Sequence, residues 1–225
     1  KYMCFDKKLI TTRELYDAWI NNWEGYEELR QRILSTVPHY GNADPYVDEE
    51  LKWCVNLYYT ICSECYSTRA PKYSCGLYGA ADHIAQGWTT FATPDGRRTG
   101  EPLADAMSPA QGRDVNGPTA VFVSTCSFDH RRFAGGLALN MRLHPTVFSR
   151  EDGVAKLRDM TKAYFEKGGM EVQYNVVDTK TLRAAQKAPE EYRDLVVRIA
   201  GYSAYFIELD RDLQNDIIAR NEIHL

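Results

Sequence analysis

Hydrophobic side chains recur every three or four positions along two stretches of the first third of the chain. The first stretch contains Leu15, Trp19, Trp23, Tyr26, Leu29 and Ile33. The second follows turn-forming residues at 41–45 and contains Leu51, Val55, Tyr58, Cys62 and Cys65. This spacing predicts amphipathic helices, with Thr11 or Thr12 as the N-terminal cap of the first.

Later segments predict both helices and strands. Val154, Leu157, Met160 and Tyr164 predict a helix, which closes at Gly168-Gly169, where a left-handed cap fits. Four apolar segments have the length of strands: residues 118–124, 138–143, 170–177 and 195–200. In the third, apolar and polar residues alternate, which is typical of a strand with two different faces. Strands that alternate with helices predict an α/β fold.

A long segment rich in glycine, proline and aspartate, residues 93–120, interrupts these patterns. A connection of this length in a compact domain is usually functional or packed in its own right. Its arginines Arg97, Arg98 and Arg113 could bind an anion, but a position on a solvated or salt-bridged surface is the more common use of each. We therefore assign these three arginines no chemical role.

Composition narrows the class of protein. The chain has 225 residues, enough for one large domain or slightly more, and a net charge of −4. That charge argues against a nucleic-acid partner, which calls for a clustered basic face. No apolar run approaches the roughly 20 residues that cross a bilayer. Six cysteines are too sparse for a disulfide scaffold. We expect a soluble, cytoplasmic protein with reduced cysteines and neither membrane nor nucleic-acid contacts.

Common catalytic and metal-binding patterns are weak in this chain. Cys62 and Cys65 have redox or metal spacing, but no second pair exists, and their place in an apolar helical stripe favours core packing. The five histidines form no metal motif, so we expect no bound metal. Asp129-His130 beside Ser127 lacks the sequence context of a catalytic triad.

The most informative segment is Val196-Val197-Arg198-Ile199-Ala200-Gly201-Tyr202-Ser203-Ala204, in which an apolar strand runs into a glycine. Gly201 by itself is typical of a turn that ends a strand. The complete nonapeptide, however, resembles the radical-site signature of the glycyl radical enzymes. Residues 93–120 and the helical pattern at 210–220 also resemble segments of that family. The resemblance implies that Gly201 carries a backbone radical.

The same resemblance implies a fold and supporting residues. The expected fold is α/β, part of a ten-stranded glycyl-radical-enzyme barrel: the second half-barrel followed by the glycine radical domain. Residues 1–120 would belong to the barrel and residues 121–225 to the radical domain. Arg198, Ala200, Tyr202 and Ser203 would support a radical loop enclosed within the barrel. Asn140 is a candidate contact in the substrate pocket, although a structural role explains it equally well.

The resemblance also implies partners. In the family, a separate activating enzyme with a 4Fe–4S cluster uses S-adenosylmethionine to install the radical, so we expect no cofactor bound by this chain. The radical then passes to a cysteine that usually stands in a Gly-Cys-aliphatic-Glu context, which none of the six cysteines matches. The start at Lys1-Tyr2-Met3-Cys4 is typical of the interior of a longer polypeptide. The missing cysteine would lie upstream in the same enzyme, and residues 1–225 alone would be inactive.

The sequence leaves the reaction open. The segments around Gly169 and Gly201 look more like the dehydratase, decarboxylase and lyase branches, acting on a small molecule in anaerobic metabolism, than like pyruvate formate-lyase itself. The intact enzyme would be an oxygen-sensitive homodimer. An alternative from another class is a stand-alone glycyl-radical subunit that replaces the oxygen-damaged end of a partner enzyme. A generic α/β binding domain with chance matches is a third interpretation.

Overall fold

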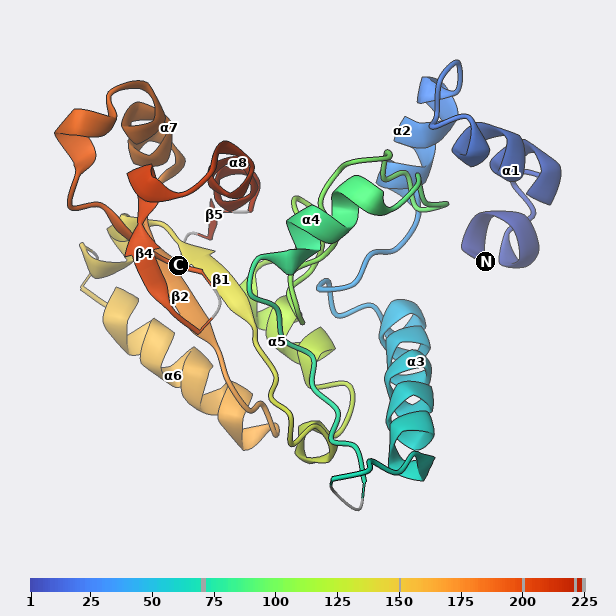
Figure 1. The fold of residues 1–225 in the computed structure, drawn as a ribbon, viewed down its shortest axis with the longest axis horizontal. Coiled ribbons are helices and arrows are strands. Elements are labelled where there is room, and N and C mark those ends of the chain that lie inside the picture. Colours follow the sequence, from blue (N-terminus) through green and yellow to red (C-terminus); the bar gives the residue numbers. More distant parts are fainter. Residues whose placement is uncertain (70–71, 150, 200, 221, 224–225) are drawn as a thin grey trace. The chain divides into compact units, whose positions relative to one another are not determined.

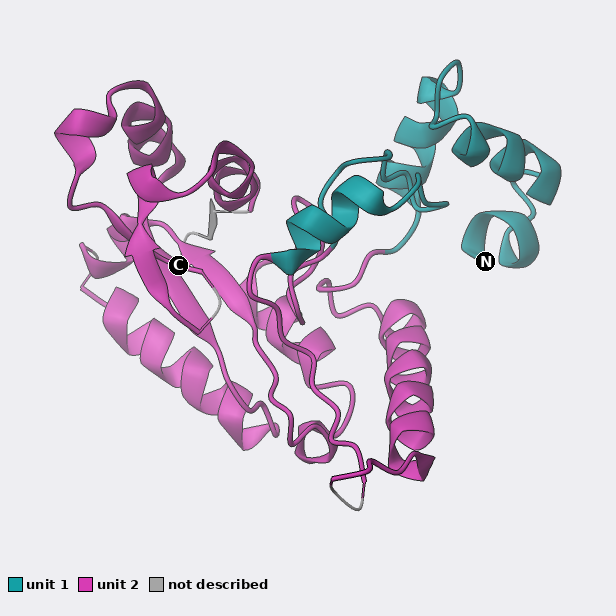
Figure 2. Cartoon of the chain, in the orientation of Figure 1, with its two compact units in different colours: residues 1–38, 82–103 teal, residues 39–81, 104–225 magenta. Residues whose placement is uncertain are grey.

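The computed structural model (Figure 1) describes residues 1–69, 72–149, 151–199, 201–220 and 222–223. They form two compact units, of residues 1–38 with 82–103 and of residues 39–81 with 104–225 (Figure 2). The two units are defined by the contacts within residues 1–225. The division predicted at residue 120 is of another kind, because it separates the barrel from the radical domain of a larger protein. That division therefore stays a prediction.

Unit 1 consists of short helices around a small apolar core. Its helices are a π-helical turn Tyr2–Asp6, α1 Thr12–Ile20, α2 Glu27–Thr36 and α4 Asp82–Thr89. The predicted cap is confirmed: the hydroxyl of Thr11 accepts from the backbone N–H of Glu14, and the Glu14 carboxylate accepts from the N–H of Thr11. The core contains Met3, Ala18, Trp23, Ile33 and Ala92.

The first apolar stretch forms two helices, α1 and α2, separated by a turn. Asn22, Trp23 and Gly25 have positive φ angles of 55°, 65° and 77° in this turn. Trp23 is fully buried, and its indole N–H donates to the carbonyl of Arg97 at 3.2 Å. Arg97 in turn donates to the carbonyls of Thr90 and Glu101, so this arginine organises the loop after α4.

Unit 2 contains the longest helix and all of the described strands. Its helices are α3 Pro45–Glu64, α5 Pro118–Thr125, α6 Gly153–Glu166, α7 Thr179–Lys187 and α8 Arg211–Ala219. Its strands are β1 Asn140–Leu143, β2 Gln173–Val176, β3 Val196–Arg198, β4 Ser203–Tyr205 and β5 Glu222–Ile223. Short helical turns lie at His130–Arg132, Pro145–Phe148, Pro189–Tyr192 and Phe206–Glu208. None of the helices in the described ranges is both long and apolar enough to cross a membrane.

A parallel sheet in the order β2-β1-β5 forms the centre of unit 2, with Asn140 opposite Gln173 and Arg142 opposite Asn175. Neighbouring side chains along a strand point to opposite faces, so each face of this sheet has its own chemistry. Helix α6 lies along one face, and α7 and α8 lie on the other (Figure 1). The α6 face is apolar, and its core contains Leu139, Met141, Leu143, Val121, Phe122 and Tyr164.

The opposite face of the sheet carries Asn140 and Arg142 from β1 and Gln173 and Asn175 from β2. This polar face is not solvated, because Asn140, Arg142 and Asn175 are each 6% exposed or less. Buried polar groups need hydrogen-bond partners, so this face determines what can pack on it.

Most predicted elements are confirmed, and one is wrong. The predicted strand 118–124 is the helix α5, which follows Gly117 with φ of 81° and has Pro118 in its first turn. Helix α6 ends as expected: Gly168 is left-handed, with φ of 99°, and the N–H groups of Gly168 and Gly169 donate to the carbonyls of Phe165 and Tyr164.

Candidate functional site

Gly201 lies at the tip of a β-hairpin formed by β3 and β4. The strands pair antiparallel, with Val196 opposite Tyr205 and Arg198 opposite Ser203, and the N–H of Ile199 donates to the carbonyl of Tyr202 at 3.0 Å. Gly201 has a φ of 79°, a conformation that favours glycine over residues with a Cβ. A Cβ built at Gly201 meets no atom within 4 Å. The α-carbon is therefore open to an approaching group.

Two amide side chains of β2 hold this hairpin. Asn175 accepts from the backbone N–H of Arg198 at 2.6 Å and donates to the carbonyl of the same residue, as a neighbouring strand would. The Oε1 atom of Gln173 accepts from the N–H of Gly201 at 3.0 Å and from Nε of Arg198 at 2.8 Å. The polar face of the sheet thus holds both strand β3, at Arg198, and the hairpin tip, at Gly201.

The proposed support residues occupy different positions around this tip. Arg198 binds Gln173, and its guanidinium also lies 3.4 Å from the Ser203 hydroxyl. Ser203 and Tyr202 are exposed, Tyr202 by 44%. Ala200 lies outside the described residues. Of the aromatic residues that follow, Phe206 is fully buried, whereas Tyr205 is 46% exposed.

Gly201 itself is exposed within this chain. The family resemblance implies that the radical loop is enclosed. Because the described residues leave Gly201 exposed, other parts of the protein would have to enclose it. Enclosure of the radical loop stays a prediction about the larger protein.

The second cluster on the polar face surrounds Asn140, the candidate substrate contact. Its side-chain amide donates to Asp105 at 2.9 Å, and its backbone N–H donates to the Ser108 hydroxyl at 2.9 Å. Its Oδ1 atom is buried and has no partner among the described residues. Asn140 is thus an organising residue whose carbonyl oxygen can still accept a hydrogen bond.

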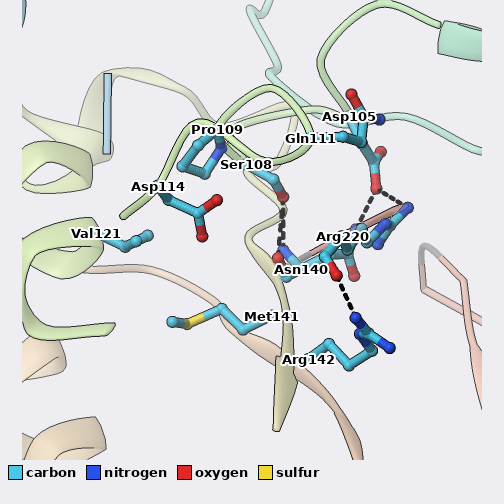
Figure 3. A pocket seen from close by; sticks show the side chains of 10 residues that line it. All are labelled: Asp105, Ser108, Pro109, Gln111, Asp114, Val121, Asn140, Met141, Arg142 and Arg220. Atoms are coloured by element: carbon cyan, nitrogen blue, oxygen red, sulfur yellow. Dashed lines mark hydrogen bonds and ion pairs between the residues drawn. The ribbon is translucent and has the colours of Figure 1, made fainter. Parts of the chain in front are cut away.

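Arg220, at the end of α8, completes this cluster (Figure 3). Its guanidinium binds Asp105 at 2.7 Å and Asp216 at 3.0 Å, and all three side chains are 10% exposed or less. The Arg142 guanidinium donates to the Thr179 hydroxyl at 2.9 Å and to the carbonyl of Arg220. The cavity between these residues has a volume of about 20 Å³. It can hold water but not an organic substrate, so Asn140 as a substrate contact stays a prediction.

His130 is not part of a catalytic triad. It is 2% exposed, and its Nε2 lies 2.7 Å from the carbonyl of Thr125, so Nε2 carries the proton. Nδ1 accepts from the N–H of Met170 at 3.2 Å. Burial lowers the pKa of His130. With both ring nitrogens engaged by the backbone, this histidine is structural.

The cysteines form no redox or metal centre within the described part of the chain. Cys62 packs against the core of unit 2, but Cys65 is exposed at the end of α3, so core packing holds for only one of the pair. Burial raises the pKa of Cys75 and of Cys126 to about 11, which keeps both thiols protonated.

Comparison with known proteins explains this arrangement. Residues 103–207 match the glycine radical family, and residues 1–87 match the pyruvate formate lyase-like family. The chain belongs to the glycyl radical enzymes. Gly201 and its hairpin lie within the part that matches the glycine radical family.

Several glycyl radical enzymes of known activity align with nearly the whole chain. It is 39% identical to trans-4-hydroxy-L-proline dehydratase of Clostridioides difficile, over 99% of the chain and 28% of that protein. It is 36% identical to the 4-hydroxyphenylacetate decarboxylase glycyl radical subunit of the same species, over 99% of the chain and 27% of that protein.

A solved structure shows the same fold. The glycerol-bound B12-independent glycerol dehydratase from Clostridium butyricum matches with a TM-score of 0.95 and 40% identity, over 100% of this chain and 28% of that one. The predicted fold class is confirmed: the chain has the mixed helix and sheet fold of part of a glycyl radical enzyme barrel. It spans less than a third of the length of these relatives.

The sequence predicts Gly201 and Arg198 as site residues, and this stays a prediction, but it does not indicate the residues that hold them. Gln173 and Asn175 were visible only as the polar positions of an alternating strand. Asp105 and Arg220 lie 115 residues apart in the chain, and no local pattern joins them.

Proposed function

We propose that Gly201 stores a backbone radical and passes it to a cysteine of the same enzyme, which starts cleavage of a small-molecule substrate. The observation that carries this proposal is the placement of a left-handed glycine at the open tip of a hairpin within the glycine radical region. A turn glycine needs no such open α-carbon, whereas hydrogen-atom transfer requires direct access to it.

The chemistry explains why the position is a glycine. A radical at Cα is stabilised when the carbon becomes planar, because the amide nitrogen then donates electron density and the carbonyl withdraws it. A Cβ crowds that plane, and only glycine lacks one. The hairpin supplies the glycine in a fixed conformation with its N–H already bound.

Activation requires a partner that supplies one electron and S-adenosylmethionine. Reductive cleavage yields methionine and an adenosyl radical, which takes one hydrogen atom from the α-carbon of Gly201 and leaves as 5′-deoxyadenosine. The glycyl radical later regains a hydrogen atom from a cysteine thiol, and the resulting thiyl radical takes one from the substrate. We place that cysteine outside residues 1–225 and expect this chain alone to be inactive.

The reaction belongs to the dehydratase, decarboxylase and lyase branch, because such enzymes are the relatives that align with almost the whole chain. A substrate contact by the buried Oδ1 atom of Asn140 would require the intact enzyme to enlarge the small cavity beside this residue. A repair subunit would need little beyond the radical domain, so the pyruvate formate lyase-like match at residues 1–87 favours part of an enzyme. We expect a cytoplasmic homodimer with no nucleic-acid or membrane partner.

Electron paramagnetic resonance on the full-length protein tests Gly201. After anaerobic treatment with an activating enzyme and S-adenosylmethionine, the native protein should show a doublet-like organic signal, and Gly201→Ala should show none. The substitution costs about 1 kcal/mol of backbone strain but meets no steric clash.

The matched control is Gly112→Ala. Gly112 has a φ of 75° and equally open surroundings, so this variant carries the same backbone penalty away from the hairpin. It should keep the signal. A signal of native intensity in Gly201→Ala would move the radical to another residue and refute the proposal.

A further inference from the structure

The side chain of Gln173 is the direct partner of the Gly201 backbone. Its Oε1 atom lies 3.0 Å from the Gly201 nitrogen and 2.8 Å from Nε of Arg198. Both of these groups are hydrogen-bond donors, so the atom facing them must be the carbonyl oxygen. Burial raises the pKa of Glu171, and an interaction with the Gln173 side chain lowers it to a smaller extent.

The residues on both sides of Gln173 are themselves held in place. The Glu171 carboxylate accepts from the backbone N–H of Leu139 at 3.2 Å, just before β1 and β2 begin. Arg198 stands opposite Ser203 across the hairpin and directs its Nε to Gln173. The Arg198 Nε–H and the Gly201 N–H thus share one acceptor, the Oε1 atom of Gln173, and the arginine fixes the position of that atom.

This geometry matters once Gly201 has lost a hydrogen atom. The radical depends on electron donation from the amide nitrogen into the half-filled orbital of Cα. An acceptor on the N–H draws the proton toward itself and leaves more electron density on nitrogen. A fixed acceptor also holds the N–Cα bond in one orientation, so the overlap persists.

We propose that Gln173 is a positioning residue for the glycyl radical, with its carbonyl oxygen holding and polarising the Gly201 N–H. Arg198 keeps that oxygen in place, which gives a physical role to the arginine of the signature. The proposal rests on the function proposed above, because it assumes a radical at Gly201.

The test compares radical properties in the full-length protein after anaerobic activation. Gln173→Met keeps the size of the side chain and removes the acceptor. The radical should still form at Gly201 but decay about two- to tenfold faster, the range that corresponds to one hydrogen bond. In protein labelled with nitrogen-15 glycine, the nitrogen hyperfine coupling should also change, which a purely structural defect would not cause.

Two further variants complete the comparison. Gln173→Glu keeps an acceptor and gives Arg198 a charged partner, so it should hold a glycyl radical with at least the native lifetime. Gln31→Met removes an exposed amide of α2 that binds Glu27, and it should match the native protein in every measurement. A folded Gln173→Met protein without a radical also supports the proposal, provided that Gln173→Glu holds one.

The contrary outcomes are distinct. Native lifetime and native nitrogen coupling in Gln173→Met would overturn the role of Gln173 and leave Gly201 as the radical site. Loss of the radical in Gln173→Glu, despite the retained acceptor, would also overturn it. A native protein with no glycyl signal overturns the proposed function, and the role of Gln173 with it.

Discussion

At the scale of single residues, His130 shows how burial makes a reactive side chain structural. Its ring is 2% exposed, and the backbone groups of Thr125 and Met170 engage both nitrogens in the neutral form. Protonation would place a second donor on Nδ1, where it faces the N–H of Met170. The folded state therefore resists protonation, in agreement with the lowered pKa of His130.

This resistance predicts a pH dependence of stability. In the unfolded chain His130 takes up a proton near its ordinary pKa of about 6.5. Because the folded pKa is lower, the unfolded state binds more protons below that value, and stability falls as pH falls through this window. The thermal midpoint of the full-length protein should drop between pH 7 and pH 5, and His130→Gln should reduce that drop.

At pH 8 the neutral ring of His130 predominates in both the folded and the unfolded state. The difference in thermal midpoint between the native protein and His130→Gln at this pH therefore measures the loss of stability caused by the substitution itself. The informative quantity is the difference between the two pH profiles of native and variant protein. Parallel profiles would show that His130 contributes nothing to the pH dependence.

The residue scale is also where sequence reasoning loses information about the site. Gly201 and Arg198 belong to one local segment, so a local pattern reveals them. Gln173 lies 28 residues earlier and meets Gly201 only because β2 and the hairpin pack together. A glutamine at an alternating position is typical of a solvent-facing side chain, and tertiary packing alone gives this one its role.

At the scale of elements, short apolar segments are the ambiguous ones. Residues 118–124 have the length of a buried strand, but the apolar residues of α5 are not confined to one side of the helix, so no helical periodicity shows. Pro118, which fits the first turn of a helix, was the available signal. Segments in which apolar and polar residues recur with a clear period, such as β2 and α6, are predicted correctly. The period arises because one face of each element packs on the apolar core and the other does not.

The docking of the hairpin on β2 belongs to the same scale. Among the described residues, β3 pairs through its backbone with β4, while the side chains of Gln173 and Asn175 join it to β2. Few hydrogen bonds have to break for the hairpin to leave the sheet, although the buried side chains of Val197 and Ile199 would then be exposed as well. Such an element can open locally while the rest of unit 2 stays folded.

Asn175→Leu should weaken this docking. The variant loses both hydrogen bonds to the backbone of Arg198, so the amide of Arg198 should exchange hydrogen roughly tenfold faster in the unactivated full-length protein. Asn215→Leu is the control, because Asn215 is exposed on α8 and binds Gln186 instead of the hairpin. Equal exchange in the two variants would show that Asn175 does not hold the hairpin.

Activation should loosen the same element. An activating enzyme must reach the α-carbon of Gly201, so residues 195–206 should lose protection from hydrogen exchange when it binds the full-length protein. Gly168-Gly169 and the turn at Pro189–Tyr192 are the hinges that we expect to absorb the movement. Unchanged protection of residues 195–206 during productive activation would rule out this opening.

At the scale of the whole molecule, the chain is a coherent part of a larger fold. Its match covers nearly all of its own length but less than a third of the relatives. The exposed position of Gly201 is consistent with this, since a carbon radical requires shelter from oxygen and stray hydrogen donors. We expect the remainder of the enzyme to provide that shelter together with the thiyl cysteine.

Oxygen therefore tests directly whether the proposed radical resides at Gly201 in the assembled enzyme. A backbone radical adds dioxygen at the α-carbon, and the resulting peroxyl species breaks the chain at that residue. Activated full-length protein exposed to air should release a C-terminal piece that begins at about Gly201, whereas unactivated protein should stay intact. Residues 1–225 alone, with an exposed hairpin, should either resist activation or be cut faster than the full-length protein. Mass spectrometry of the released piece identifies the residue, and cleavage elsewhere despite a measured radical would exclude Gly201 as its carrier.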